Sequence, residues 1–187
     1  PAPVAAVRTA PAAGAPRGAA GFVLRPPQLL FDGVDPAATP AHLGAGWLVV
    51  TEALPGTTAQ EPFAGEAGTL LLAMLRALHL HRHPRVHLAA LERVAHGEGA
   101  EEPAAALGAH LAALQPAMVL LMGRAAAQTV LGSSEPLGRL RAQVHLRGGV
   151  PHVVTYDPPY LLRAQADKAR AWADLVLALR VLRGDGA

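Results

Sequence analysis

Residues 117–123 read "AMVLLMG", a continuous apolar run that ends in glycine. A short run of this kind, bounded by turn signals, is typical of a strand that is buried on both faces. A helical pattern precedes it in "EEPAAALGAHLAALQP" (101–116), and a shorter one follows it in "RAAAQTVLG" (124–132). Strands that alternate with helices indicate a mainly parallel sheet with helices on both faces. We therefore predict an α/β fold with three layers, α/β/α, around this central strand.

The same alternation extends in both directions along the chain. On the N-terminal side, "GWLVVTE" (46–52) predicts a buried strand, residues 67–80 an amphipathic helix, and residues 85–91 a short strand. On the C-terminal side, "QVHLRGGVPHVVTY" (143–156) predicts a hairpin turned at its paired glycines, and residues 166–183 predict a final helix. One face of that helix is expected to carry Trp172, Leu175, Val176 and Leu179.

The 187 residues suit one domain with a tail. Residues 1–20 alternate Pro, Ala and Gly without periodicity, so we predict a flexible linker there. The domain is expected to occupy residues 21–187, with "GFVLRPPQLLF" (21–31) as a short strand or an extended arm.

Composition excludes several classes of site. The chain has no cysteine, which rules out disulfides, thiolate zinc sites and a cysteine-held iron–sulfur cluster, and we expect no cofactor. The net charge is +2, yet the pI is about 9.7, because the bases are arginines except for Lys168. Arginine binds phosphate well, so DNA contact is an expectation, although a GC-rich genome would also favour this composition. No apolar run reaches the length of a membrane span, and a cytoplasmic protein is expected.

The run "HLHRHPRVH" contains His79, His81, His83 and His87. Imidazoles spaced by two residues on an extended segment could share a face and hold zinc. No acidic residue lies close in sequence, and the run crosses a helix end and a proline. We favour a solvated loop and expect no metal.

The stretch "TYDPPYLLR" (155–163) follows an apolar run and precedes a helical pattern. Two adjacent prolines fix φ and remove two N–H donors, so the strand must end at about Asp157. One interpretation is a bend in which Asp157 caps the next helix. The other is a site, because ligands bind beyond the strand ends of α/β sheets.

The stretch "PGTTAQEPFAGEAGTLL" (55–71) leads from a strand into a helix. Gly65 and Gly68 would let backbone N–H groups approach a phosphate or a base closely. Phe63 offers a face on which a flat ring could stack. An ordinary strand–loop–helix junction is the alternative.

Together, "TEALPG…EPFAGEAGTLL" and "TYDPPYLLR" resemble the two signature regions of the uracil-DNA glycosylase superfamily. The iron–sulfur branch is the most similar, with GEAPG, PFVGxAGxLL and HPSYLLR in the same order. "LQPAMVLLMGRAAAQTVLG" (114–132) is similar to the segment between them, and the resemblance covers about residues 47–182. It implies the three-layer fold of that family and an enzyme that takes uracil out of the base stack.

The resemblance also implies site residues. Glu52 would belong to the water-positioning loop, and Asp157 would stand at the family's motif histidine; both are vestigial catalytic positions. The base-binding positions would be Pro55, Gly56 and Phe63. The DNA-binding positions would be Gly65, Tyr160, Leu161 and Arg163.

Several departures indicate an eroded site. The leaving uracil gains negative charge, and a carboxylate at 157 about 4 Å away would cost on the order of 4 kcal/mol, roughly a thousandfold in rate. The family reads uracil with an asparagine; this chain has none, and "LAALER" (88–93) stands there. Leu54 is an extra residue, and the cluster cysteines are missing. We therefore expect weak or absent base excision in a DNA-repair lineage.

A weaker resemblance is to the psi subunit of DNA polymerase III, a clamp-loader adaptor of the replisome. It depends on the "LP" after the strand, the "LRAL" of 75–78, and a proline turn with "LRA" before the helix of Trp172. It implies a non-catalytic adaptor with a chi-like partner. With either resemblance, repair or replisome proteins are possible partners, and the chain alone is expected to be a monomer.

Overall fold

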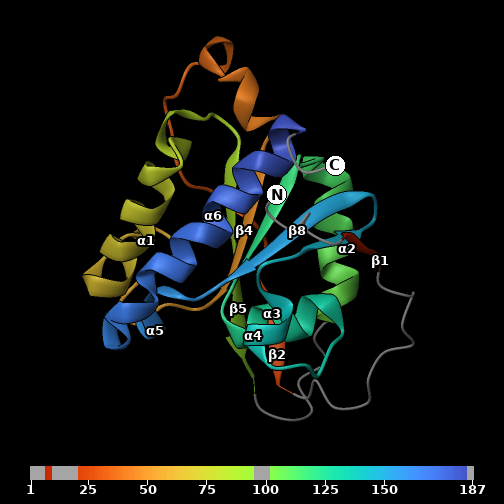
Figure 1. Cartoon of the computed structure of the whole chain (residues 1–187). Coiled ribbons are helices and arrows are strands. Elements are labelled where there is room, and N and C mark those ends of the chain that lie inside the picture. Colours follow the sequence, from red (N-terminus) through yellow and green to blue (C-terminus); the bar gives the residue numbers. More distant parts are fainter. Residues whose placement is uncertain (1–6, 10–20, 95–101, 185–187) are drawn as a thin grey trace.

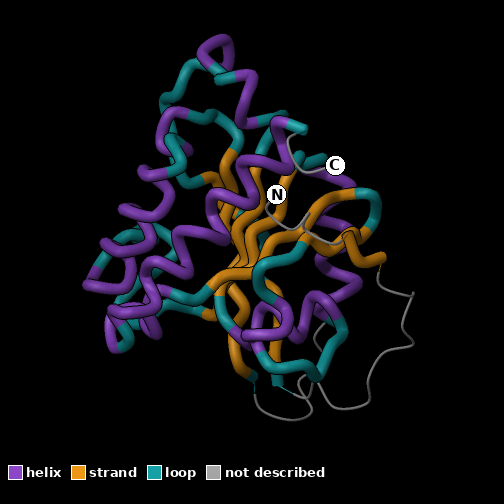
Figure 2. Tube along the Cα trace, in the orientation of Figure 1, coloured by secondary structure: helices purple, strands orange, loops and turns teal. Residues whose placement is uncertain are grey.

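A twisted sheet of eight strands runs through the centre of the molecule (Figure 2). The computed structural model describes residues 7–9, 21–94 and 102–184. The strands are β1 (Val7–Thr9), β2 (Phe22–Leu24), β3 (Gln28–Leu29), β4 (Trp47–Glu52), β5 (Val86–Arg93), β6 (Met118–Met122), β7 (Val144–Arg147) and β8 (Val150–Thr155).

The strand order is β1-β7-β8-β6-β4-β5-β2, with β3 also paired to β5. The four central strands β8, β6, β4 and β5 are parallel to one another. Antiparallel pairs occur only towards the edges among the described strands, where β2 and β3 join β5 and where β7 joins β8. The prediction of a mainly parallel sheet is therefore confirmed, and so is the hairpin, whose turn is Gly148–Gly149.

Helices cover both faces of this sheet (Figure 1). One layer consists of α1 (Gly65–Ala77), α5 (Pro158–Arg163) and α6 (Lys168–Arg183). The other layer consists of α2 (Pro103–Leu114), α3 (Arg124–Leu131) and α4 (Leu137–Leu140). Short 3-10 helices lie at η1 (Pro36–Ala38), η2 (Ala41–Leu43), η3 (Leu80–Arg82) and η4 (Gln165–Asp167). No helix within the described ranges is both long and apolar enough to cross a bilayer.

The apolar strands explain why two layers of helices form. In β4, Trp47 and Val49 face the α1 and α6 layer, whereas Leu48 and Val50 face the α2 and α3 layer, and all four are fully buried. All five residues of β6 are likewise fully buried. A strand without a polar face must be covered on both sides, which is the reason for the three-layer architecture.

Two sequence-based expectations need correction. Val7–Thr9, inside the predicted linker, form β1; the other residues of 1–20 lie outside the described part. Trp172 is 47% exposed, so the buried face of α6 is not the predicted one. The residues buried on α6 are Ala171, Asp174, Leu175 and Ala178. Two alanines let the helix lie close to the sheet, and the large indole therefore points outwards.

His145 and His152 are direct partners across β7 and β8 and are both buried. His152 Nδ1 donates to the Val150 carbonyl at 2.9 Å, and His152 Nε2 has no partner. The pKa of His152 is lowered to about 4, mainly by burial and to a smaller extent by the nearby Arg147 and His145, while the hydrogen bond to Val150 opposes this shift. The side chain is therefore held neutral inside the domain.

This burial predicts a loss of stability in acid. Between about pH 6.5 and pH 4 the unfolded chain binds a proton at His152 that the folded chain does not bind, so the free energy of unfolding falls as the pH falls. The full pKa difference corresponds to about 3 kcal/mol. Urea unfolding from pH 7 to pH 4 should therefore show a shallower pH dependence for His152→Leu than for the wild type. Parallel pH profiles for the two chains would contradict this assignment.

Candidate functional site

The C-terminal ends of the parallel strands meet at one edge of the sheet, the lower edge in Figure 1. The register pairs Glu52 with Leu91, Thr51 with Met122, and Met122 with Thr155. The segments that follow β4, β6 and β8, together with the last residues of β5, therefore lie along this strand-end edge. Both sequence motifs singled out above follow strands that end here, so the sheet brings them to the same edge.

Asp157 caps α5 at the end of β8. Its Oδ1 accepts a hydrogen bond from the Tyr160 N–H at 2.8 Å, which confirms the capping interpretation of "TYDPPYLLR". The carboxylate also packs against Gly123 at the end of β6, where a Cβ atom would lie 2.6 Å from Asp157 Oδ2. Glycine at 123 thus allows Asp157 to sit between the ends of two central strands. In this role the carboxylate accepts hydrogen bonds and does not donate them.

Of the three DNA-binding positions predicted in α5, only Arg163 is exposed. Leu161 is 1% exposed and belongs to the core, so in this conformation its side chain does not reach the surface. Tyr160 is half-buried, its ring stacks on Tyr156 with centroids 4.8 Å apart, and its hydroxyl donates to Asp167 at 2.7 Å. That hydrogen bond raises the pKa of Tyr160.

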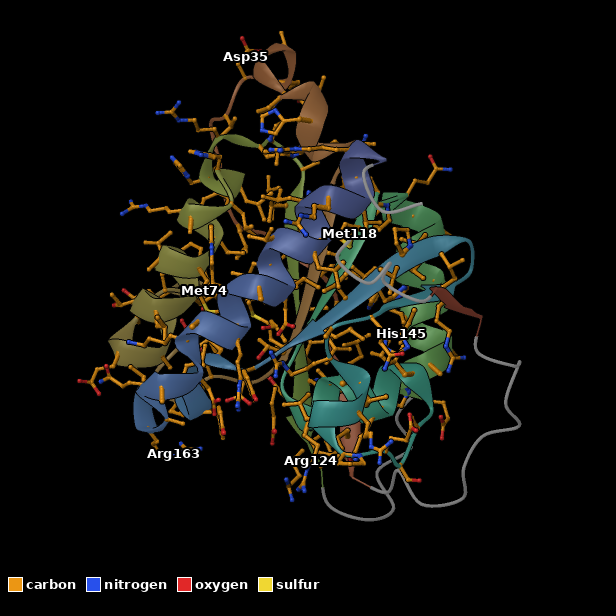
Figure 3. The ribbon with its side chains drawn as sticks, in the orientation of Figure 1. Asp35, Met74, Met118, Arg124, His145 and Arg163 are labelled. Carbon is orange, nitrogen blue, oxygen red and sulfur yellow. The ribbon has the colours of Figure 1, made fainter. Side chains whose placement is uncertain are left out.

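Arginines line the strand-end edge. Arg124 begins α3 directly after Gly123, and both Arg124 and Arg163 project from the lower part of the molecule (Figure 3). Arg93 ends β5 with its side chain 75% exposed, and it lies 3.5 Å from Glu52. Sequence reasoning missed Arg124 and Arg93. Their position directly at a strand end was the available signal.

Glu52 is the last residue of β4, and its side chain is 46% exposed. Its ion pair with Arg93 joins the ends of the neighbouring strands β4 and β5. Pro55 and Gly56 follow it in an exposed loop, and Gly65 is exposed at the first position of α1.

Phe63 is half-buried between this loop and the core. Its ring stacks on Phe31, with centroids 5.6 Å apart and planes 18° apart. A Cβ atom at Gly68 would lie 2.4 Å from the Phe63 backbone, so the glycine lets the first turn of α1 pack against the chain at Phe63. One face of the predicted stacking wall is therefore occupied by another aromatic ring of the same chain.

A cavity of about 370 Å³ opens between the β4–α1 loop and the β2–β3 side of β5. Its polar lining includes Arg25, Gln28, Thr51, Thr58 and Glu92. Arg25 Nε donates to Glu92 Oε2 at 2.7 Å, and the buried Thr51 hydroxyl has no partner. Leu88 and Glu92, from the stretch that stands where the resembled family has its asparagine, both line this space. At Glu92 the cavity presents an ion pair in place of the family's amide, whereas the carboxamide of Gln28 lines it from β3.

The histidine run does not assemble a metal centre among the described residues, which contain no group of three or more possible ligands. His83 is fully buried; its Nδ1 accepts from the Arg85 N–H at 3.0 Å, and its Nε2 lies 3.0 Å from the Gly44 carbonyl oxygen. Because Nδ1 accepts, Nε2 carries the proton and donates to Gly44. The two ring nitrogens of His83 therefore join the segment before β5 to the segment before β4.

Comparison with known families finds one similarity that spans most of the chain. The model of the Uracil DNA glycosylase superfamily matches residues 24–176. This interval begins in β2, ends in α6 and includes the described segments of the strand-end edge. No curated protein matches the chain.

Proposed function

Since the chain belongs to the uracil-DNA glycosylase superfamily, we propose that it is a DNA-associated member of that superfamily in which base excision is weak or lost. The observation that carries this proposal is the role of Asp157. In the family resemblance this position belongs to a histidine that donates to the uracil ring. Here the side chain is a carboxylate whose Oδ1 accepts the Tyr160 N–H as the helix cap.

The chemistry of the leaving group explains why this exchange matters. Cleavage of the glycosidic bond leaves negative charge on uracil, and catalysis requires donors aimed at that charge. A carboxylate about 4 Å away would instead raise the barrier by on the order of 4 kcal/mol at an effective dielectric near 20. The carboxylate of Asp157 therefore supports weak or lost base excision.

The cavity beside β5 supports the same conclusion. Uracil presents two carbonyl oxygens and one N–H, which a carboxamide can match with one donor and one acceptor. Leu88 offers neither, and the Glu92 carboxylate is acceptor-only and already bonded to Arg25. Residues 88–93 therefore lack the carboxamide that the family has there, and the one carboxamide in the lining of the cavity comes from Gln28 of β3.

DNA association is supported by the exposed arginines of the strand-end edge. Arg93, Arg124 and Arg163 come from three different segments, yet the parallel sheet brings them to one side. Guanidinium groups bind phosphate oxygens in a forked geometry, and their contacts are salt-dependent. A single strand laid along this edge would place its backbone against these side chains.

We expect the double variant Arg124→Ala/Arg163→Ala to bind single-stranded DNA more weakly, with the slope of log affinity against log salt reduced by about 1.4, or 0.7 for each lost phosphate contact. Fluorescence anisotropy across a salt series measures this slope. The control is Arg76→Ala, because Arg76 is exposed in the last turn of α1, at the opposite end of the sheet. Equal slopes for the wild type and the double variant would contradict DNA binding at this edge.

Release of uracil from a labelled single-stranded oligonucleotide tests the proposed function directly. The wild-type chain is expected to bind this oligonucleotide and to leave almost all of it uncleaved after alkali treatment. Rapid and specific release of uracil by the purified protein would overturn the proposal.

A second candidate function is a non-catalytic adaptor of the psi type. Leu54, the residue that is extra relative to the glycosylase motif, is only 6% exposed and packs in the core, so the psi-like "LP" spacing is accommodated without a surface bulge. Trp172 leaves an exposed indole on α6 for a partner protein. Co-purification with clamp-loader proteins that is lost in Trp172→Ala would favour this candidate over the first.

A further inference from the structure

The two tryptophans of the chain have opposite environments. Trp47 is fully buried, and its Nε1 donates to the Leu43 carbonyl at 2.8 Å, whereas Trp172 on α6 is 47% exposed. Within the described ranges, the indole of Trp172 makes no ring contact with another aromatic side chain. A single exposed apolar residue is common on protein surfaces, so the surroundings of Trp172 decide whether its exposure indicates a binding surface.

Small and flexible side chains surround this indole. Residues three and four positions away are the neighbours of a side chain on a helix surface. For Trp172 they are Lys168 and Ala169 on the preceding turn, and Leu175 and Val176 on the next turn. Lys168 and Ala169 are exposed, Val176 is half-buried and Leu175 is buried. The ring therefore lies between a short apolar surface and an ammonium group one turn away.

The exposed charges of α6 are all positive. The helix contains one acidic residue, Asp174, which is buried and paired with Arg141 at 2.7 Å. The exposed charged residues of α6 are Lys168, Arg170, Arg180 and Arg183. Of these, Arg170 is paired with Asp167 at 2.9 Å. An aromatic face among cations, with no acidic side chain of the helix exposed beside it, is complementary to a polyanion that carries flat rings.

This surface begins beside the strand-end edge. Arg163 ends α5, and the 3-10 helix η4 leads from there directly to Lys168, the first residue of α6. Figure 1 shows α6 leading away from α5 across the molecule, and Figure 3 shows Arg163 at the lower end. Lys168 Nζ donates to Gln165 Oε1 at 3.5 Å, so its ammonium group stays near this junction. Arg163, Lys168 and Trp172 therefore follow one another from the strand-end edge along α6.

We propose that Trp172 stacks on a base of a single DNA strand that continues from the strand-end edge along α6. Lys168 contacts a phosphate beside that base, and the indole covers the face of the base. This assignment rests on the proposed association with DNA and adds a contact that tolerates any sequence, because every base has a π face. The contact favours single strands, since the bases of a duplex are already stacked on one another.

Tryptophan fluorescence reports this stacking, because Trp47 is shielded from any ligand. We expect a single-stranded oligothymidylate to quench the fluorescence of the wild type and to leave Trp172→Phe, in which only Trp47 emits as a tryptophan, unchanged. An oligonucleotide of the same length with abasic residues keeps the phosphates and should not quench. Binding of oligothymidylate detected by anisotropy without quenching would overturn the stacking and leave the DNA association standing. Absence of any binding would overturn both.

Affinity across a salt series provides an independent measurement. Trp172→Leu keeps an apolar side chain but loses the π face, so it should bind oligothymidylate about tenfold more weakly, whereas Trp172→Phe should stay within about threefold of the wild type. The slope of log affinity against log salt should not change in Trp172→Leu, because no phosphate contact is lost. Leu29→Ala is the matched control, since Leu29 on β3 is 43% exposed and should not contact DNA. Wild-type affinity in Trp172→Leu, or a reduced slope, would overturn the proposal.

Discussion

Asp157→Asn is expected to release uracil from single-stranded DNA faster than the wild-type chain, by up to about a thousandfold. The gain arises because the substitution removes a negative charge from the strand-end edge, where the leaving base becomes an anion. Asparagine caps helices as well as aspartate does, so the hydrogen bond from the Tyr160 N–H and the start of α5 should both be retained. The expected change is therefore in rate, with little change in stability.

Single-turnover release of uracil, measured with enzyme in excess, is the appropriate readout. The matched control is Asp35→Asn, because Asp35 is also a helix cap that accepts an N–H, that of Ala37, at 2.9 Å. Figure 3 shows Asp35 at the end of the molecule opposite Arg124 and Arg163, so this variant should release uracil at the wild-type rate. Rates within twofold of the wild type for Asp157→Asn would refute the view that this carboxylate suppresses excision.

The central strands and their helices were predictable because their signals are local. Residues 117–122 and 47–50 are apolar without interruption, so both faces of each strand are apolar and must be covered. The hairpin could equally be predicted, because the adjacent glycines 148 and 149 mark a turn. In the structure both adopt positive φ, at 55° and 77°. These features depend on residues that are close in the sequence.

The cavity could not be predicted for the opposite reason. Arg25 and Glu92 are 67 residues apart, and only the antiparallel pairing of β2 with β5 brings them into an ion pair. The stacking of Phe63 on Phe31 likewise depends on a segment that precedes the whole central sheet. The sequence around either residue of such a pair does not indicate which distant residue it will contact.

The outward position of Trp172 has a different cause. Periodicity assigned the buried face of the last helix by hydrophobicity, and tryptophan dominates such an assignment. The sheet instead accepts the narrow face with Ala171 and Ala178, which permits close approach. It also accepts Asp174, a charged residue that periodicity would never place inside.

Asp174 is tolerated in the core because Arg141 neutralises it. Arg141 Nε donates to Asp174 Oδ2 at 2.7 Å, and the two side chains are 10% and 1% exposed. Arg141 also donates to the Tyr156 hydroxyl at 2.9 Å, and its guanidinium carbon lies 4.0 Å from the centroid of that ring. This pair therefore joins the end of α4 to α6 and to the residue directly before Asp157, so it also holds the strand exit.

Arg141→Leu is expected to lower the free energy of unfolding by about 3–5 kcal/mol at pH 7, because it leaves the buried carboxylate of Asp174 without its charged partner. Burial raises the pKa of Asp174, and the hydrogen bond and charge of Arg141 oppose that rise. Without Arg141 the pKa of Asp174 rises further. At pH values above the ordinary pKa of an aspartate, the folded variant therefore binds more protons than the unfolded variant. The stability of Arg141→Leu should therefore fall as the pH rises from acid to neutral.

Urea unfolding of Arg141→Leu at pH 5 and pH 7 measures this dependence, and the double variant Arg141→Leu/Asp174→Leu supplies the test of its cause. Replacing both members of a buried pair by apolar residues removes the unpaired charge, so the double variant should regain most of the lost stability and lose the extra pH dependence. A double variant as unstable as Arg141→Leu would show that the guanidinium acts by packing against Tyr156. The same result would show that the ion pair between Arg141 and Asp174 does not explain why α6 can bury an acidic residue against the sheet.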